Sequence, residues 1–165
     1  MLRQPQKELP SITFGATLRA STEYDQAHRA EFGYLNYVQG RVGCSAWAAG
    51  VVDINQWLQV AWGGQKRKVT SIATQGRADA DQWVKEYVVK YTLDGETWYL
   101  ADNGRVFQGN ADRTTVKLQP LQNPVLARSV RICPVTWSSH ISMRCEVYYE
   151  EEEESSAKAL QEKSC

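Results

Sequence analysis

The sequence predicts an all-β fold, an antiparallel sandwich or barrel of about seven or eight short strands. Polar and apolar residues alternate with a period of two in residues 56–62, as they do in a strand with one face on a core. The same pattern returns between turn signals at Gly63-Gly64, Gly76 and Asp94-Gly95. No segment has the apolar spacing of an amphipathic helix. Short alternating runs between regular turns are typical of this fold class.

Residues 55–100 are the part of the chain around which we expect the rest to be arranged. We interpret them as a β-meander, in which each strand pairs with the next one along the chain. Asp94-Gly95 lies between KYTL and ETWYL and predicts a tight hairpin, because Gly supplies the positive φ that such turns require.

The remaining elements follow from local pattern. Residues 1–10 are polar and broken by Pro5 and Pro10, which predicts a flexible N-terminal arm. A long loop spans residues 39–55, and loops of this length inside a domain are usually functional. Pro120 and Pro124 are expected to close the strand before them. The further strands are predicted at residues 11–20, 34–38, 114–118, 126–133 and 141–149.

The chain ends in a run of five glutamates, residues 150–154, followed by SSAKALQEKSC. A block of like charge repels itself, so residues 151–165 are predicted to form a disordered acidic tail. The predicted organisation is therefore an arm over residues 1–10, a single domain over 11–150 and a tail over 151–165. A chain of 165 residues is long enough to bury one core without staples.

Composition narrows the classes of function. Nineteen basic and nineteen acidic residues cancel, whereas nucleic-acid binders usually carry a basic face, so nucleic acid is not expected as a partner. The apolar stretches are far shorter than the roughly 20 residues that cross a bilayer. The N-terminus has no apolar signal segment. The sequence favours a cytoplasmic or non-classically secreted protein, or an extracellular one if a leader has been removed.

Cysteine and histidine usage argues against a zinc site. Four cysteines lie without CxxC spacing, and the chain has two histidines. Cys133 and Cys145 lie in predicted strands on either side of a turn, so they could form a cross-strand disulfide or remain buried free thiols, and the absence of a signal segment favours thiols. Neither a nucleophile elbow, a phosphate-binding loop nor an HExxH motif is present, so we do not expect an enzyme.

Several segments together carry a family resemblance. NQWLQV, then VTSIATQGRADADQWVKEYVVKYTLDGETWY, then FQGNADRTT, then PVLARSVRICPVTWSSHISMRCEVY resemble the discoidin domain, also called the coagulation factor V/VIII type C domain. The closest similarity is to the N-terminal domain of slime-mould discoidins. The resemblance implies an eight-stranded, distorted jelly-roll β-barrel or sandwich of the galactose-binding-domain type. It also implies a binding module whose ligand loops are residues 22–31, 41–50 and 77–82.

The candidate ligand-binding residues lie in these loops. In the first loop an aromatic ring stands beside polar groups, as a sugar site requires, although an ordinary solvated loop would look the same. Trp47 could stack on a sugar ring or pack beneath its loop. Arg77 could reach a ligand or form a structural pair with Asp53 or Asp81. Asp79 is freer to meet a ligand. The candidates are Tyr24, Asp25, His28, Trp47, Arg77 and Asp79.

The other tryptophans are expected in the core rather than at the ligand, because they lie on the strand pattern. These are Trp57, Trp62, Trp83, Trp98 and Trp137. A loop calcium ion is left open, since oxygen ligands are present without a recognisable frame. The residues that offer those oxygens are Asp102, Asn103, Asn110 and Asp112. No other cofactor is expected.

The expected function is a non-catalytic adhesion module that recognises a glycan through the loops at one end. The alternatives are a peripheral membrane module for anionic phospholipid headgroups and a domain that binds a cell-surface or matrix protein. The first and third loop tips hold more acid than base, which disfavours a negative bilayer. Oligomerisation is left open.

Overall fold

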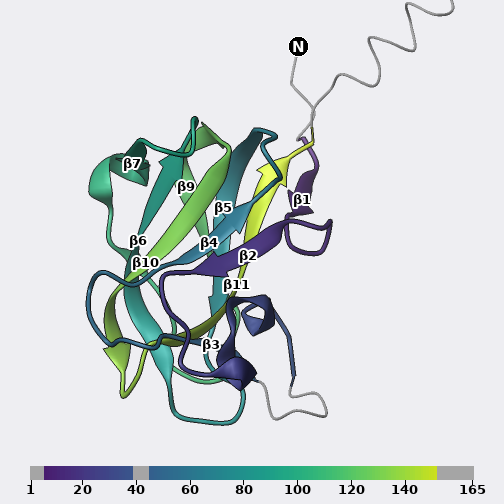
Figure 1. Cartoon of the computed structure of the whole chain (residues 1–165). Helices are drawn as coiled ribbons and strands as arrows, with labels where there is room; N and C mark the ends of the chain where they lie inside the picture. Colours follow the sequence, from purple (N-terminus) through teal and green to yellow (C-terminus); the bar gives the residue numbers. More distant parts are fainter. Residues whose placement is uncertain (1–5, 39–44, 152–165) are drawn as a thin grey trace, which may run out of the picture.

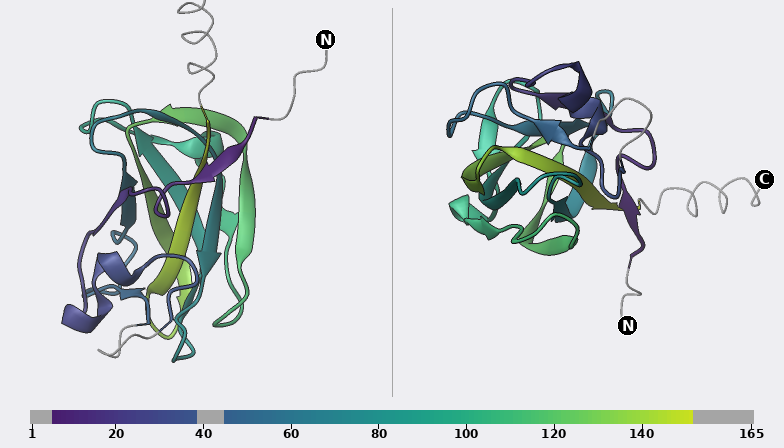
Figure 2. Two further views of the ribbon diagram at one scale, coloured as in Figure 1. Left: turned by 90° about the vertical axis from the view of Figure 1, so that its right-hand side faces the viewer. Right: turned by 90° about the horizontal axis from the view of Figure 1, so that it is seen from below.

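A computed structural model describes residues 6–38 and 45–151, which fold into two antiparallel sheets packed face to face (Figure 1, Figure 2). One sheet has five strands, with order β1-β11-β5-β9 and β3 paired to β11. The strands of this sheet are β1 (Glu8–Pro10), β3 (Trp47–Ala48), β5 (Arg67–Gln75), β9 (Lys117–Ala127) and β11 (Ser142–Glu150).

The second sheet has six strands, with order β2-β4-β10-β6-β7 and β8 paired to β6. Its strands are β2 (Thr17–Ala20), β4 (Leu58–Ala61), β6 (Trp83–Thr92), β7 (Trp98–Leu100), β8 (Phe107–Gln108) and β10 (Ser129–Ser138). Short 3-10 helices occur at η1 (Gln26–His28), η2 (Ala30–Phe32) and η3 (Ala101–Gly104). In the described part of the chain no helix is long and apolar enough to cross a membrane.

The hydrophobic core lies between the sheets and confirms the predicted fold class. Leu58 and Val60 are fully buried while Gln59 between them faces outward, as the period of two predicted. Tyr87 and Phe107 stack inside the core with ring centroids 5.3 Å apart. Because the sheets are separate hydrogen-bonded units, the architecture is a sandwich rather than a closed barrel.

The predicted β-meander is wrong except for its last hairpin. β4, β5 and β6 are consecutive in the chain, yet β5 lies in the five-stranded sheet and the other two in the six-stranded sheet. Their turns therefore carry the chain from one sheet to the other. β6 and β7 do pair, and Gly95 has the expected positive φ of 86°. The alternation of side chains identifies a buried face but not the neighbouring strand.

The predicted N-terminal arm is also wrong for its last residues. Residues 8–10 form β1, which pairs with β11 through Glu8 opposite Glu150. Pro10 is tolerated because β1 is an edge strand, which does not need every N–H. Of the predicted strand over residues 11–20, only β2 forms, and residues 34–38 contribute only a bridge from Tyr34 to Cys145.

The prolines of β9 do not end the strand as predicted. β9 continues through Pro120 and Pro124 to Ala127, which is possible because it is the edge of its sheet. The predicted acidic tail lies outside the described residues apart from Glu151. The N–H of Glu151 still donates to the carbonyl of Lys7, 3.0 Å away, and so extends the pairing of the two ends.

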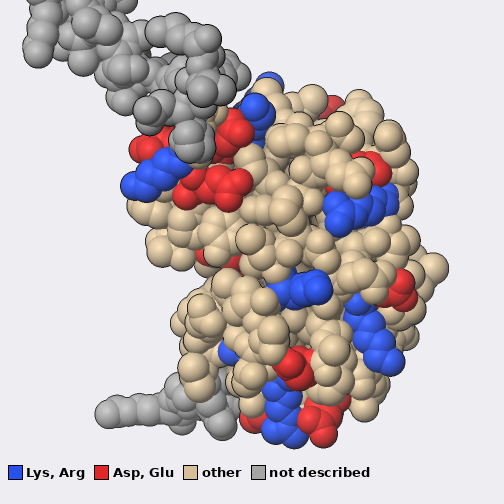
Figure 3. Space-filling view, turned by 180° about the vertical axis from the view of Figure 1, so that it is seen from behind, with Lys and Arg blue, Asp and Glu red and all other residues tan. Residues whose placement is uncertain are grey.

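The tryptophans predicted to be core are only half-buried. Trp62 and Trp137 do pack against the core. Trp57 and Trp98 do not, because they lie on the outer face of the six-stranded sheet with the guanidinium of Arg131 between them. On the opposite face of the molecule, basic and acidic side chains are intermixed (Figure 3).

A buried arginine connects β11 to three other segments. Arg144 is 2% exposed, and its guanidinium donates to the carbonyls of Tyr37, Gly76 and Arg113 at 2.7 to 2.8 Å. Burial lowers the pKa of Arg144. No ion pair of Arg144 is recorded within residues 6–38 and 45–151, so backbone dipoles take the place of a carboxylate.

Cys133 and Cys145 are free, buried thiols, as the sequence favoured. They lie on strands of different sheets, β10 and β11. Burial raises the pKa of Cys133 to about 11 and that of Cys145 well above its usual value. Both are therefore poor nucleophiles in the folded protein.

The first prediction concerns Arg144. Replacing it with Met removes the donors of three carbonyls, that of Gly76 buried and those of Tyr37 and Arg113 part-buried, so the free energy of unfolding should fall by about 3 kcal/mol. Arg144→Lys should recover only part of this loss, because an ammonium lacks the planar fork. Urea unfolding measures both, with the exposed Arg19→Met as the control. Equal stability of Arg144→Met and wild type would contradict the connecting role of this side chain.

The second prediction concerns the buried thiols. In a Cys44→Ser, Cys165→Ser background, a thiol reagent at pH 8 should label neither Cys133 nor Cys145 in the native protein, and should label both after unfolding. A thiol with a pKa of about 11 holds about one thiolate in a thousand at that pH. Rapid labelling in native buffer, followed by mass spectrometry, would show that one of them is accessible.

Candidate functional site

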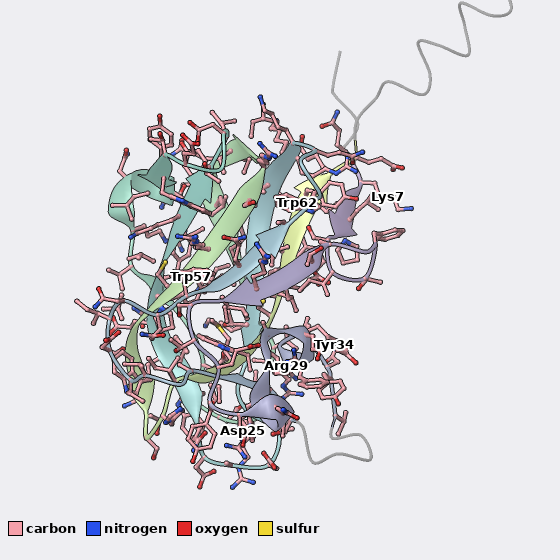
Figure 4. All side chains as sticks on the ribbon, in the orientation of Figure 1. Lys7, Asp25, Arg29, Tyr34, Trp57 and Trp62 are labelled. Atoms are coloured by element: carbon pink, nitrogen blue, oxygen red, sulfur yellow. The ribbon has the colours of Figure 1, made fainter. Side chains whose placement is uncertain are left out.

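Three loops and strand β3 meet at the end of the sandwich opposite the described chain ends, near Asp25 in Figure 4. The loops are the segment of η1, the connection after β5 and the connection between β10 and β11. Together they enclose a hollow of about 270 Å³. Its lining residues are Tyr24, His28, Ala48, Arg77, Gln82 and His140. We call this hollow the loop pocket.

Asp25 and His28 form the frame of the first loop. Asp25 caps η1, where its side chain accepts from the N–H of Ala27 at 2.9 Å. Nδ1 of His28 lies 2.6 Å from Oδ1 of Asp25, and this hydrogen bond lowers the pKa of Asp25. Nε2 of His28 is closed off from water and has no hydrogen-bond partner in the described part of the chain. A buried polar atom of this kind usually has a partner.

Tyr24 supplies the exposed aromatic ring of the loop pocket. Its N–H donates to the carbonyl of Ala48 at 2.9 Å, and the residue is 62% exposed. The ring stands edge-on to both histidines, with centroids 6.0 Å from His28 and 5.6 Å from His140. The rings of His28 and His140, which are far apart in the sequence, therefore set the orientation of the Tyr24 ring.

Arg77 is held by three neighbours rather than by either predicted acid. Its Nε lies 2.7 Å from Oδ1 of Asp79 and 3.2 Å from Oγ of Ser45, and Nη1 donates to Oε1 of Gln82 at 3.0 Å. Asp81 instead pairs with Arg113. The carboxylate of Asp53 accepts hydrogen bonds from nearby residues, namely the N–H of Asn55 and the side-chain amide of Gln56. The predicted partners of Arg77 are therefore wrong, and Asp79 is not free.

The charge of Arg77 is balanced inside the site. Burial pushes the pKa of Asp79 upward, but hydrogen bonds from Arg77 and Ser45, together with the charge of Arg77, outweigh it and lower this pKa overall. Asp79 therefore stays ionised beside the guanidinium. Asp25 and Asp79 support the loop pocket, while Tyr24, His28 and Arg77 line it.

Trp47 cannot stack on a ligand. It is completely buried, and its Nε1 donates to the carbonyl of Thr22 at 2.9 Å beneath the first loop. The packing role that the sequence left open for Trp47 is the one that forms, and its prediction as a ligand-binding residue is wrong.

Besides Ala48, sequence reasoning missed two polar lining residues, Gln82 and His140. Oε1 of Gln82 accepts from Arg77 and from Oγ of Ser142, which leaves its amide nitrogen for other contacts. Nε2 of His140 lies 2.7 Å from the carbonyl of Ala49. Both residues belong to the motifs DQWV and HIS that carried the family resemblance. That resemblance, and not any local spacing, was the available signal.

The two carboxylates considered for calcium, those of Asp102 and Asp112, accept hydrogen bonds from backbone N–H groups. The carboxylate of Asp102 accepts from the N–H groups of Gln122 and Asn123, and that of Asp112 accepts from two N–H groups that follow it. Within the described ranges no group of three or more His, Cys, Asp or Glu residues is arranged to hold a metal ion.

An exposed apolar segment adjoins the first loop. Val51, Val52 and Ile54 are 48%, 42% and 70% exposed. The N–H of Val51 donates to Oγ1 of Thr22, which places the start of this segment beside the first loop. Asp53 lies within it, so the surface is apolar but not basic.

Known proteins share this fold and much of this sequence. A discoidin-1 polypeptide of Dictyostelium discoideum is 42% identical over 135 residues, which cover 79% of this chain and 53% of that protein. The chain thus spans about half the length of this relative. The solved structure of discoidin II from the same organism superposes with a TM-score of 0.84 at 32% identity, over 90% of this chain and 60% of that one.

More distant structures share the fold alone. A family 32 CBM of Clostridium perfringens NanJ, solved in complex with galactose, has a TM-score of 0.65 at 19% identity, over 86% of this chain and 99% of that one. The profile of the F5/8 type C domain matches residues 17–147. With the sandwich topology and the discoidin relatives, this match shows that the chain belongs to the F5/8 type C, or discoidin, domain family.

Proposed function

We propose that this domain is a non-catalytic carbohydrate-binding module whose ligand enters the loop pocket. The observation that carries the proposal is an exposed aromatic ring, Tyr24, beside polar side chains in a hollow of about 270 Å³. A sugar ring presents C–H groups on its faces and hydroxyls around its edge. Tyr24 would take a C–H face, while Arg77, Gln82 and His140 would meet the hydroxyls.

The electrostatics of the loop pocket favour a neutral sugar. The charge of Arg77 is already matched by Asp79 at 2.7 Å, and no lysine lines the pocket. An anionic ligand would find no unbalanced positive charge there. Three N–H groups of Arg77 remain without an assigned partner in the described chain and can still donate to hydroxyls.

His28 has a conditional role. Its Nε2 lacks a partner but lies behind the present surface, so a ligand hydroxyl reaches it only if the exposed Tyr24 ring turns aside. Otherwise His28 acts by orienting Tyr24. A pocket of one sugar ring binds weakly, so adhesion would require several copies acting together.

A second candidate, docking on phospholipid, is favoured by one observation. The exposed Val51, Val52 and Ile54 could enter the headgroup region of a bilayer. Asp53 within this segment opposes attraction to anionic lipids, which requires nearby Lys or Arg. We therefore place the carbohydrate function first.

The third prediction tests the loop pocket with galactose, the sugar present in the NanJ structure. Tyr24→Ala and Gln82→Ala should each weaken retention on a galactose-bearing glycan surface by about tenfold, because each removes a direct contact. Tyr99→Ala is the matched control, since this half-exposed tyrosine lies on β7, outside the loop pocket. A glycan array extends the test to other sugars.

Vesicle flotation separates the two candidates. Salt-sensitive binding to phosphatidylserine vesicles that Val52→Asp abolishes, with no glycan retained on the array, would replace the carbohydrate function by the membrane one. Loss of glycan binding in Tyr99→Ala, at the same level as in Tyr24→Ala, would show that the effect does not arise in the loop pocket.

The fourth prediction concerns acid. The pKa of Asp79 is lower in the folded protein than its usual 3.8, so its contact with Arg77 is fully stabilising above that pH and is lost as the pH falls through the lower, folded-state value. Wild type should therefore unfold at a higher temperature than Asp79→Asn at neutral pH, and the difference should disappear in strong acid.

Asp81→Asn is the control for this pH series. Asp81 is a loop aspartate whose pair with Arg113 is more exposed, so it should change the unfolding temperature little at any pH. A difference between wild type and Asp79→Asn that grows as the pH falls would contradict the assigned pairing.

A further inference from the structure

A second hollow, of about 550 Å³, lies on the outer face of the six-stranded sheet. Its residues are distinct from those of the loop pocket. Thr17, Ala61 and Ser129 form a row across β2, β4 and β10, and their small side chains leave the space open. We call it the sheet hollow. Trp57, on its border, is labelled in Figure 4.

The neighbouring row across the same strands is basic. Arg19 on β2 and Arg131 on β10 are both paired in register with Gln59 on β4. Strands lie nearly 5 Å apart, so the backbones that carry the two arginines are separated by about 10 Å. Arg128, next to the floor residue Ser129, adds a third guanidinium to the lining.

Arg131 is held rigidly at the centre of this surface. Its guanidinium carbon lies 3.8 Å from the ring centroid of Trp57 and 3.9 Å from that of Trp98, and Nε donates to Oε1 of Gln59 at 3.0 Å. Burial lowers its pKa. Hydrogen bonds for its Nη1 and Nη2 groups are not recorded in the described chain, so the planar outer edge of the guanidinium is available.

The positive charges of the sheet hollow are not matched by ion pairs. In residues 6–38 and 45–151, recorded ion pairs involve Arg29, Arg77, Arg105 and Arg113 but not Arg19, Arg128 or Arg131. The guanidinium of Arg128 donates to the carbonyl of Asp94, at 3.4 Å, which is its one recorded hydrogen bond among the described residues. The lining acids are Asp94 and the exposed Glu96, and the Asp94 carboxylate accepts from two N–H groups of its own turn.

We propose that the sheet hollow binds an acidic saccharide, with its carboxylate or sulfate on the outer edge of Arg131. A guanidinium offers two parallel donors that match the two oxygens of such a group. The indoles fix this fork before binding, which removes part of the entropy that ordering an arginine costs. The floor hydroxyls of Thr17 and Ser129 provide partners for sugar hydroxyls.

Size and spacing favour a saccharide over a small inorganic ion. The hollow is twice the volume of the loop pocket, so a bare sulfate would leave most of it to water. The separation of about 10 Å between the strands of Arg19 and Arg131 allows a second anionic group, farther along the same saccharide, to meet Arg19. The two sites thus divide their ligands by charge, with neutral sugar in the loop pocket and acidic sugar in the sheet hollow.

The test uses the full chain and follows the indole Nε1–H signals of Trp57 and Trp98 by nuclear magnetic resonance. Glucuronate and glucose 6-sulfate should shift both signals in a saturable way, whereas glucose should not. Arg131→Gln should weaken binding about tenfold or more, since a charge-assisted hydrogen bond is lost. Arg19→Gln should weaken it about threefold, which is the effect of one exposed charge.

Matched controls separate binding from folding and from general charge. Lys117→Gln removes one exposed positive charge from β9, in the other sheet, and should leave the affinity unchanged. His140→Ala changes the loop pocket and should also leave it unchanged. Because Arg19 is exposed and unstacked, its variant tests the proposal even if Arg131→Gln unfolds.

Three outcomes would overturn the proposal. The first is the absence of saturable shifts with either acidic sugar. The second is an equal loss of affinity in Lys117→Gln and Arg19→Gln, which would indicate general charge attraction. The third is inorganic sulfate binding as tightly as glucose 6-sulfate, which would indicate a small-anion site rather than a saccharide site.

Discussion

The loop end of this domain is connected by one buried cation. Arg144 extends from β11 to carbonyls in three segments that are far apart in the sequence, at Tyr37, Gly76 and Arg113. Gly76 directly precedes Arg77, so this connection helps to place the loop pocket. Gly76 itself has no room for a side chain, because an added Cβ would lie 2.4 Å from the carbonyl oxygen of Asp112. The loops are thus positioned by backbone contacts as much as by their own sequences.

Three arginines show how the surroundings of one side chain decide its role. Arg144 is buried among carbonyls and serves the architecture. Arg77 is neutralised by Asp79 and keeps donors for uncharged hydroxyls. Arg131 is held by aromatic faces, which attract a cation without cancelling its charge as a carboxylate would. The family resemblance placed Arg77 near a ligand, but nothing in the sequence distinguishes these three environments.

The sequence predicted the fold class because alternation is a local property. Leu58, Gln59 and Val60 alternate as expected, and Asp94-Gly95 forms the turn between β6 and β7. Strand partners are not local, which is why the predicted meander fails where β5 joins the other sheet. Pro10 and Pro120 were misleading for a related reason, since proline is excluded from central strands but accepted at edges.

The candidate site was predictable only in part. Tyr24, His28 and Arg77 were found from their loops, while His140 comes from a turn more than a hundred residues away from Tyr24 and meets it only after folding. Trp47 and Trp57 illustrate the same limit. The first was a candidate for the ligand and is buried, and the second was assigned to the core and faces outward. Residue type predicts that a tryptophan ring will be at least partly shielded from water. It does not predict whether core side chains, as for Trp47, or a surface guanidinium, as for Trp57, will shield it.

The pairing of β1 with β11 has a mechanical consequence. Glu8 lies opposite Glu150, so the two ends of the described domain are neighbours, about 5 Å apart between Cα atoms. A force that pulled these ends in opposite directions would load the hydrogen bonds of this antiparallel pair one after another, as in opening a zipper. The bonds of the short strand β1, together with the flanking contacts of Lys7 with Glu151 and of Ser11 with Val147, would break in turn. Tension applied through the two ends would therefore meet little resistance, whereas tension between one end and a ligand in the loops would act along the strands, against many hydrogen bonds at once.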